Sequence, residues 1–407
     1  MMMALFYIHS ICIFGGCLYA ALHKNYVGLN KKRMRIAVNT RLLLKNKVDG
    51  TGTFTDEIFK RITTGHPEVE FVFLFDRPYH QDFIYNSNIE PVIISPPTRH
   101  PFLWYYWFEH KVPRVLRKFN CDLFVSPDGY LSLSATTKSI NVIHDINFFH
   151  RPQDLPKLAS WYFNYFFPLY AKKAERIITV SEYSKNDIST NYHIDKEKID
   201  IVHNSVTDDF GPLGTDEKAK IKLDYKLADN YFVFIGTVLP RKNLINLILA
   251  FDQFLTSTEK PFELVVIGNE KFGLKEIKET LSKIKHPEGI RFLGRLDKER
   301  LIKILAASKG LLYVPFFEGF GIPLVEAMKC GVPILTSNVT SLPEIAKDAA
   351  LYANPESIDS ITGGINKLAI DEGHRNRLIE NGKQRVKDFS WEESASRFWE
   401  SIEYVLE

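Results

Sequence analysis

Cysteine is scarce in this sequence of 407 residues, and the Asp-x-Asp motif is absent. Its four cysteines have no C-x-x-C spacing, which excludes zinc ribbons and a disulfide framework and indicates a reducing compartment. No Asp-x-Asp triplet, the usual metal-diphosphate signature, occurs anywhere in the chain. A large excess of one charge is also missing, because the net charge is +3 and the pI is near 8.4. We therefore expect neither a bound metal nor a nucleic-acid partner.

Charge is absent from one long stretch near the amino terminus, residues 4–22, which is about long enough to span a bilayer. Basic residues follow it at Lys24, Lys31, Lys32 and Arg33. As a membrane anchor, this run would leave the rest of the chain in the cytoplasm, attached to the inner membrane. No positive charge precedes the run, which disfavours a cleaved signal peptide. The alternative is an upstream extension from a wrongly assigned start codon, since Met34 opens directly on a predicted strand. Both interpretations place residues 1–33 outside the folded domains.

The chain is longer than one typical hydrophobic core, so we expect two domains. In the first half, residues 34–209, apolar runs alternate with helical patterns. The predicted strands are 35–39, 70–75, 91–95, 122–125, 140–144, 176–180 and 198–202. Many of these runs are continuous, as in parallel strands that are buried on both faces. The pattern predicts a doubly wound parallel sheet, whose ligands bind beyond the carboxyl ends of the strands.

Two of these strand ends carry candidate site residues. Gly52 lies in a glycine-bearing loop, residues 48–53, which we expect to precede a helix over 54–62. Such a loop suits an anion or a close-lying sugar, and an ordinary strand-to-helix turn is the alternative. His144 ends the predicted fifth strand and is a candidate hydrogen-bonding or acid-base group. A purely structural histidine is the alternative there.

Aromatic residues are concentrated in two stretches, residues 102–108 and 161–167, and each stretch precedes a group of Lys or Arg. Aromatic side chains beside cations suit a membrane interface. Helices that cover a sheet have a similar composition, and we favour this core interpretation for both stretches.

A polar segment with Gly and Pro, residues 207–214, marks the expected domain boundary, and a second series of strands and helices follows over 210–388. Its predicted strands are 231–235, 263–267, 290–293, 311–314, 333–336 and 350–352. Arg241 and Lys242 come just after the first of them. A guanidinium and an ammonium at such a turn are suited to neutralise a diphosphate, and a solvated basic turn is the alternative.

The stretch 317–328 is the other candidate in this half. Glu318 and Glu326 bracket two glycines and Pro323, which fits the first turn of a helix. Glycine lets the backbone approach a ligand closely, and the amino terminus of a helix favours anions. The pattern therefore suits a sugar, a phosphate and a ribose held side by side. A capped helix with two solvated glutamates is the alternative.

The motifs of the second half resemble, as a set, the retaining GT-B glycosyltransferases of family 4. They occupy residues 236–243, 292–294, 314–323, 326–328, 331–333 and 337–344. The resemblance runs from Met34 to the end of the chain. It implies an α/β fold of the GT-B type, with two Rossmann-like domains facing a central cleft. It also implies that residues 389–407 form a helix crossing back onto the first domain.

The resemblance also assigns the donor site. The residues concerned are Gly52, His144, Arg241, Lys242, Glu318, Gly319, Phe320, Gly321, Leu324, Val325 and Glu326. Glu318 would contact hydroxyls of the donor sugar, and Glu326 would bind those of the ribose. Backbone amides around Gly319–Gly321 and of Leu324 and Val325 would hold sugar and phosphate.

Arg241 and Lys242 would bind the diphosphate in this family, and Gly52 would approach the same phosphates. His144 would contact the transferring sugar or orient the acceptor. We therefore take His144, Glu318, Arg241 and Lys242 as the catalytic set. One departure is Thr237, where many members have Arg, so the division of labour between Arg241 and Lys242 stays open.

The resemblance implies transfer of a hexose, with retention, from a nucleotide-diphospho-sugar to an acceptor hydroxyl. The variant Gly-Thr-x-x-Pro-Arg-Lys-Asn over 236–243 resembles mannosyltransferases and points to GDP-mannose. The expected acceptor is a glycan or lipid-linked glycan in cell-surface polysaccharide assembly, and no cofactor is expected. A GT-B phosphorylase or epimerase, or a non-catalytic binder of sugar nucleotides, are the alternatives.

Overall fold

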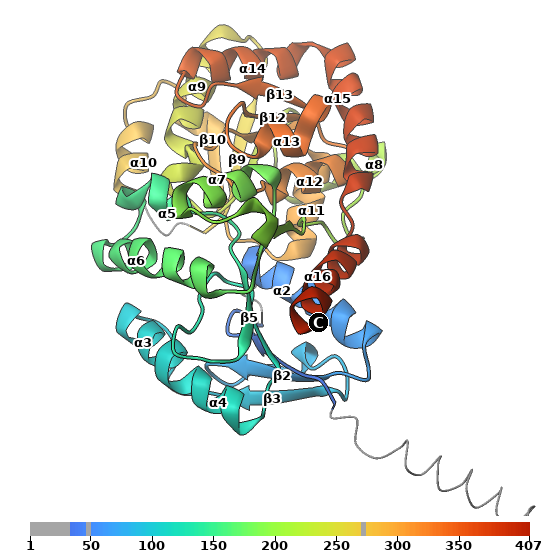
Figure 1. Ribbon diagram of the computed structural model, residues 1–407. Coiled ribbons are helices and arrows are strands. Elements are labelled where there is room, and N and C mark those ends of the chain that lie inside the picture. Colours follow the sequence, from blue (N-terminus) through green and yellow to red (C-terminus); the bar gives the residue numbers. More distant parts are fainter. Residues whose placement is uncertain (1–32, 46–49, 270–273) are drawn as a thin grey trace, which may run out of the picture.

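The structure is a computed structural model, and it describes residues 33–45, 50–269 and 274–407. The uncharged run 4–22 lies outside this part of the chain, as do Val48 and Asp49 of the predicted glycine loop. Figure 1 shows two bodies: a lower one built from the first half of the chain and an upper one built from the second half.

The lower body is organised around a parallel sheet of seven strands in the order β3-β2-β1-β4-β5-β6-β7. The strands are β1 (Arg35–Asn39), β2 (Glu70–Phe75), β3 (Ile89–Ile93), β4 (Leu123–Ser126), β5 (Lys138–Val142), β6 (Arg176–Thr179) and β7 (Ile199–Ile201). All seven predicted strands are confirmed. The inner strands are buried on both faces, as their continuous apolar runs indicate, whereas the edge strands β3 and β7 are only partly buried. Two of them, β3 and β5, begin two residues earlier than expected, since pairing with the neighbouring strand sets where a strand starts.

The upper body contains a second parallel sheet, in the order β10-β9-β8-β11-β12-β13. Its strands are β8 (Tyr231–Ile235), β9 (Glu263–Ile267), β10 (Ile290–Gly294), β11 (Gly310–Tyr313), β12 (Ile334–Ser337) and β13 (Ala350–Ala353). In both sheets the strand order reverses at the first strand of the domain, between β1 and β4 and between β8 and β11, as in doubly wound folds. In such folds, ligands bind beyond the carboxyl ends of the strands at this point.

Helices flank both sheets (Figure 1). In the first domain they are α2 (Gly50–Gly65), α3 (Pro101–Tyr106), α4 (Val112–Lys118), α5 (Asn147–His150), α6 (Lys157–Lys173) and α7 (Glu182–Tyr192). In the second they are α8 (Thr215–Asp224), α9 (Leu244–Ser257), α10 (Leu274–Leu281), α11 (Lys298–Ala307), α12 (Ile322–Lys329), α13 (Leu342–Ala346), α14 (Ile358–Ile370) and α15 (Glu372–Arg385). A π-helical turn, Trp107–Lys111, joins α3 to α4.

Helix α2 corrects one prediction, because it begins at Gly50 and not near Phe54. Gly52 therefore lies in the first turn of the helix and not in a preceding loop. A hydrogen bond of 2.9 Å from the Thr55 hydroxyl to the Thr51 carbonyl supports this turn. Gly and Thr have low helix propensity, which tertiary packing overrides at this position.

The last helix, α16 (Trp391–Leu406), returns to the first domain and packs against α2, β5 and β6, as expected (Figure 1). Its Phe398 ring lies 5.5 Å from the ring of Phe59 and 6.2 Å from that of Phe54, both on α2. The Ser401 hydroxyl donates to the Asp200 carboxylate at 2.8 Å, on the edge strand β7. The first domain is therefore covered by a helix that the end of the chain supplies.

Aromatic residues of α3 and α6 only partly follow the core interpretation. One face of α6 is buried, with Tyr162 and Tyr170 in the core, and so are Trp107 and Phe108 in the π-helical turn that follows α3. No residue of α3 itself is fully buried. The opposite face of α6 is exposed to solvent. The core interpretation thus explains the buried aromatic residues. It does not explain the aromatic residues of α3 and α6 that are exposed to solvent.

Candidate functional site

The loop between β11 and α12 carries most of the predicted donor site, and glycine determines its path. Gly321 has a φ of +93°, and a Cβ there would lie 2.6 Å from Leu342. Pro323 occupies the first turn of α12, as predicted. The Leu324 N–H donates to the Gly321 carbonyl at 2.9 Å, so this amide is already engaged in the structure.

Gly319, in the same loop, lies against the first domain. A Cβ at this position would be 2.6 Å from both the His144 carbonyl oxygen and the Asp145 Cβ, so only glycine permits this approach. The Ser181 and Ser184 hydroxyls, at the start of α7, donate to the Gly319 carbonyl at 2.6 and 3.2 Å. The second-domain loop therefore lies next to the His144–Asp145 segment that follows β5.

Glu318 joins the two predicted cations of the second domain. Its Oε1 accepts a hydrogen bond of 2.7 Å from the Arg241 guanidinium and another from the Lys242 ammonium. Lys242 also donates to the Tyr313 hydroxyl, at the end of β11. Three residues that the resemblance assigned to the donor are thus in direct contact, although β9, β10 and β11 lie between them in the sequence.

Burial has a different effect on each charge of this cluster. Burial alone would raise the pKa of Glu318, but Lys242 and Arg241 outweigh it and hold the pKa below its ordinary value. Burial lowers the pKa of Lys242 to about 8, and the Arg241 charge contributes to this, while Glu318 opposes it. Glu318 is the carboxylate in contact with both cations, and the nearby Asp145 charge also favours the charged forms of Arg241 and Lys242. A guanidinium and an ammonium held side by side in this way are suited to an anionic ligand.

Glu326, on α12, is a carboxylate without a compensating contact. Within the described residues it has no hydrogen bond or ion pair, and it is half-buried. Its removal from water raises the pKa to about 7, although the Lys298 charge lowers it slightly. Buried polar groups are ordinarily paired, so an uncompensated carboxylate of this kind fits a binding role for ligand hydroxyls.

The amino termini of α2 and α12 meet between the two domains. Gly50 and Ile322 are the first residues of these helices, and a Cβ on Gly50 would lie 3.2 Å from the Ile322 side chain. Gly52 is buried in the first turn of α2. Because the amino end of each helix has a partial positive charge, the meeting point favours an anion.

His144 follows β5 and is half-buried. Its Nε2 is 3.1 Å from the Pro127 carbonyl, which only accepts, so the Nε2–H donates there. The ring packs edge-on against Phe54 of α2, with ring centres 5.0 Å apart. These contacts hold the imidazole beside the Gly319 loop. Whether His144 acts on the sugar or the acceptor stays a prediction.

Phe320 has a packing function that the sequence did not indicate. Its buried ring lies 5.9 Å from that of His203 and 5.5 Å from that of Phe389, in a hydrophobic cluster shared with the first domain. The side chain thereby fixes the loop whose backbone is the predicted ligand contact.

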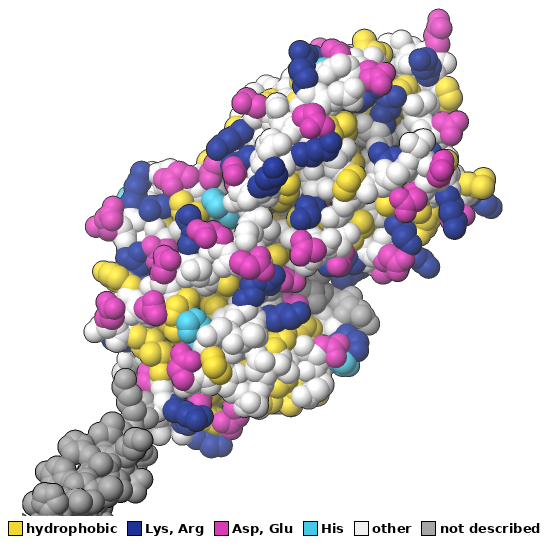
Figure 2. Space-filling model, turned by 90° about the vertical axis from the view of Figure 1, so that its right-hand side faces the viewer, with side chains coloured by type: hydrophobic (Ala, Val, Ile, Leu, Met, Phe, Trp, Pro, Cys, Tyr) yellow, Lys and Arg dark blue, Asp and Glu magenta, His cyan; other side chains and the backbone are white. Residues whose placement is uncertain are grey.

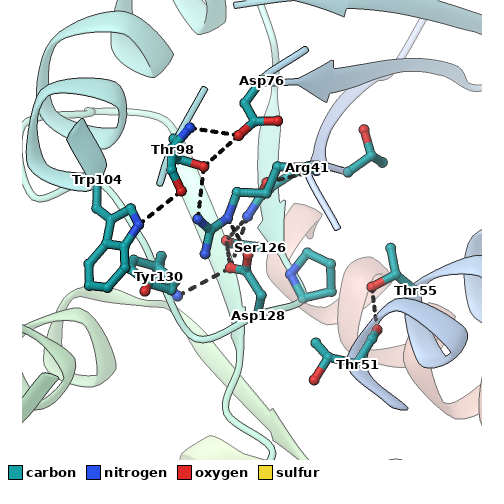
Figure 3. Close-up of polar contacts among 12 residues, drawn as sticks. Arg41, Thr51, Thr55, Asp76, Thr98, Trp104, Ser126, Asp128 and Tyr130 are labelled. Atoms are coloured by element: carbon teal, nitrogen blue, oxygen red, sulfur yellow. Dashed lines mark hydrogen bonds and ion pairs between the residues drawn. The ribbon is translucent and has the colours of Figure 1, made fainter. Parts of the chain in front are cut away.

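Sequence reasoning missed a buried arginine at the carboxyl edge of the first sheet (Figure 3). The Arg41 guanidinium donates to Asp128 at 2.6 Å and to the Thr98 hydroxyl at 3.0 Å, and it lies 4.1 Å from the Tyr130 ring centre. These contacts fix a buried charge at this edge of the sheet. No motif marks Arg41, because its partners are far away in the sequence.

Glu344 is the second residue whose position was missed, although it belongs to a motif that supported the resemblance. Its carboxylate accepts the N–H groups of Glu182 and Tyr183, both at 2.8 Å. These are the first residues of α7, in the other domain. A carboxylate of the second domain therefore caps a helix of the first.

Two parallel-sheet domains with a returning C-terminal helix define the GT-B architecture. The family model for glycosyl transferases group 1 matches residues 215–385, and the model for Glycosyltransferase Family 4 matches residues 48–210. The chain therefore belongs to these glycosyltransferases.

Named relatives and solved structures agree with this assignment. O-antigen chain mannosyltransferase B of Escherichia coli is 29% identical over 363 residues, covering 86% of this chain and 94% of the relative. O-antigen chain mannosyltransferase RfbU of Salmonella typhimurium is 26% identical over 71% of this chain and 78% of that protein. Anabaena HepE, solved with UDP-glucose, superposes with a TM-score of 0.71 at 16% identity, covering 91% of this chain and all of that one. WaaG, a glycosyltransferase of lipopolysaccharide biosynthesis, also gives 0.71 at 14% identity, covering 89% and 98%.

Metal-binding clusters and membrane-spanning helices are both absent from the part of the chain that the structure describes. Among residues 33–45, 50–269 and 274–407, no cluster of three or more His, Cys, Asp or Glu side chains is arranged to hold a metal ion. Within the same ranges, no helix combines the length and the apolar character that crossing a bilayer requires.

Proposed function

We propose that this glycosyltransferase moves mannose from GDP-mannose to an acceptor hydroxyl, with retention of the anomeric configuration. The observation that carries the proposal is the cluster of Glu318, Arg241 and Lys242. Glu326 is connected to this cluster through Tyr313, because its charge acts on the hydroxyl to which Lys242 donates. Arg241 and Lys242 are suited to a diphosphate, while Glu318 and Glu326 are suited to sugar and ribose hydroxyls. In this arrangement one nucleotide sugar contacts every charged group of the loop.

The proposed mechanism relies on placement of charge and needs no side-chain nucleophile. Arg241, Lys242 and the amino termini of α2 and α12 stabilise the negative charge that develops on the departing diphosphate. A leaving phosphate oxygen accepts the proton of the acceptor hydroxyl, which attacks from the same face of the sugar. Contacts such as that of Gly319 with His144 keep the domains together and exclude water from this step.

Two observations support mannose as the transferred sugar. Two relatives, which are 29% and 26% identical to this chain, are named as O-antigen chain mannosyltransferases. The residues 236–243 also have the Gly-Thr-x-x-Pro-Arg-Lys-Asn form. We further propose that the acceptor is a growing polysaccharide or lipid-linked glycan at the cytoplasmic face of the inner membrane. No metal is included in the proposal, because side-chain cations and helix termini neutralise the diphosphate.

A panel of nucleotide sugars tests the donor. Thermal shifts with GDP-mannose, UDP-glucose and free GDP identify the nucleotide, and NMR of the product glycoside reports its anomeric configuration. Lys242→Ala and Glu326→Ala are expected to abolish transfer and to leave the fold intact. Lys260→Ala, which removes an exposed lysine outside the cluster, is the matched control. Turnover at the wild-type rate in both site variants would refute the proposed site.

Product analysis distinguishes the other reactions that this fold supports. A phosphorylase would form a sugar phosphate with free phosphate, and an epimerase would convert the donor alone. A non-catalytic binder would leave the donor unchanged when acceptor is present. It would also show no slow hydrolysis of the donor when acceptor is absent.

A further inference from the structure

One side of the first domain exposes large apolar side chains from two neighbouring helices, α3 and α6. We call it the aromatic face and define it by Phe102, Tyr105, Leu158, Trp161, Tyr165 and Leu169. Phe102 is 71% exposed, and Trp161 and Tyr165 are 57% and 55% exposed. On α6 these residues recur every three or four positions, so they share one side of the helix.

The aromatic face is a continuous surface. Phe166, which is buried on α6, lies 5.8 Å from the Tyr105 ring of α3 and 5.0 Å from the Tyr165 ring. Tyr165 in turn stacks on Trp161 with 5.7 Å between the ring centres. In Figure 1, α3 and α6 lie on the same side of the lower body. Contiguous exposed apolar surface of this kind marks a site of interaction.

The charges around this face have one sign. Residues 99–118 and 155–173 carry eight Lys or Arg and a single acidic residue, Glu109. The whole chain has 52 Lys and Arg against 49 Asp and Glu, so the remainder has 44 against 48 and is net acidic. Glu109 is itself buried, where it accepts the N–H groups of Leu133 and Ser134 at 2.8 and 2.9 Å. The two segments that carry the aromatic face are therefore strongly basic.

The opposite side of the molecule provides a contrast. Figure 2 shows the side to the right of Figure 1, where Lys and Arg are interspersed with Asp and Glu. An evenly mixed surface remains in water. Exposed Trp and Tyr among basic residues instead match the boundary of an anionic bilayer, where the rings enter the headgroup region and the cations meet lipid phosphates.

We propose that the aromatic face is the surface by which this protein docks on an anionic lipid bilayer. This proposal adds a membrane surface to the proposed function, and it rests on that function in one respect, the lipid-linked acceptor. Trp104 of α3 donates to the Thr98 carbonyl at 3.0 Å and packs 5.4 Å from the Tyr130 ring, which Arg41 covers (Figure 3). The docked surface thus borders the carboxyl edge of the first sheet. A lipid-linked acceptor keeps its lipid in the bilayer while its sugar extends to that edge.

Tryptophan fluorescence of the full chain tests the docking directly. The chain has five Trp, and none lies in the uncharged run 4–22, so this run contributes nothing to the emission. Phosphatidylglycerol vesicles with brominated acyl chains quench a Trp that enters the bilayer. We expect quenching of the wild type, loss of most of it in Trp161→Phe, and no such loss in Trp399→Phe. The matched control Trp399 lies on α16.

Charge removal is the second arm of the test. Replacing Arg114, Arg117 and Lys118 by Gln should weaken binding to phosphatidylglycerol vesicles at least about tenfold and leave binding to phosphatidylcholine unchanged. If Trp161→Phe and the wild type were quenched equally, the proposal would be wrong, because the membrane contact would then lie elsewhere, for example in residues 4–22. If the wild type self-associated in the absence of vesicles and Trp161→Phe did not, the proposal would also be wrong, because the aromatic face would then bind a second copy of the chain. Neither arm requires donor or acceptor, so a failure of membrane docking is distinguishable from a failure of mannosyl transfer.

Discussion

Replacing Glu326 by Gln should stabilise the protein and weaken its binding of nucleotide. The half-buried, uncompensated carboxylate has a pKa of about 7, against an ordinary value of 4.5. A shift of this size corresponds to at most about 3.5 kcal/mol of free energy of unfolding at high pH. Because the side chain is only half-buried, screening by water reduces the expected gain to about 1–2 kcal/mol.

The pH dependence follows from the direction of the pKa shift. Folding raises the pKa of Glu326, so the folded state binds this proton more tightly than the unfolded chain does. The contribution is complete below pH 4.5, and it is lost as the pH rises through about 7. Glu326→Gln should therefore match the wild type near pH 5 and exceed its stability near pH 8. Urea unfolding at these two pH values measures the difference.

Nucleotide binding should change in the opposite direction. The ionised carboxylate would form charge-assisted hydrogen bonds with both ribose hydroxyls, and its loss costs about 1.5–3 kcal/mol, or roughly 10- to 100-fold in affinity for GDP. Calorimetric titration at pH 8 provides this value, and Glu400→Gln, at an exposed position on α16, is the matched control. A variant that is less stable at pH 8, or equally stabilised at both pH values, would refute the reasoning.

Further predictions concern the contacts between the domains and the charge of the cluster. Gly319→Ala places a methyl group 2.6 Å from the His144 carbonyl, so transfer should fall more than tenfold and small-angle scattering should show a more open molecule; an unchanged scattering curve would contradict this. Glu344→Gln should destabilise the protein by about 1 kcal/mol, because α7 loses its capping charge, whereas Glu400→Gln should not. Donor affinity should also decline above pH 8, where Lys242 loses its proton, and a flat profile in Lys242→Arg would attribute the decline to this residue.

The two sheets were predictable because their strands are long apolar runs buried on both faces. Such runs leave little choice of structure, and the observed ends differ from the predicted ones by no more than two residues. The start of α2 was not predictable in this way. Gly50 joins the helix where it meets Ile322 of α12, a contact between residues more than 250 positions apart.

The donor site was predictable only as a set of motifs. Glu318 and Lys242 are 76 positions apart, so spacing alone left a capped helix and a solvated turn as alternatives. The family resemblance assigned Glu318 and Lys242 to one donor site, and the structure shows the two side chains in contact. Arg41 and Glu344 had no such signal for their contacts, since Asp128 is 87 positions from Arg41 and Glu182 is 162 positions from Glu344. Contacts between residues that are far apart in the sequence leave no local pattern.

The exchange of parts between the two bodies limits how this enzyme can be recombined with its relatives. A chimera cut at residues 207–214 would separate α16 from α2 and α7 from the carboxylate that caps it. To transplant acceptor specificity, the helix Trp391–Leu406 must travel with the first domain, and position 344 must remain a carboxylate in the recipient. The transferable unit is therefore discontinuous in the gene, although it is compact in space.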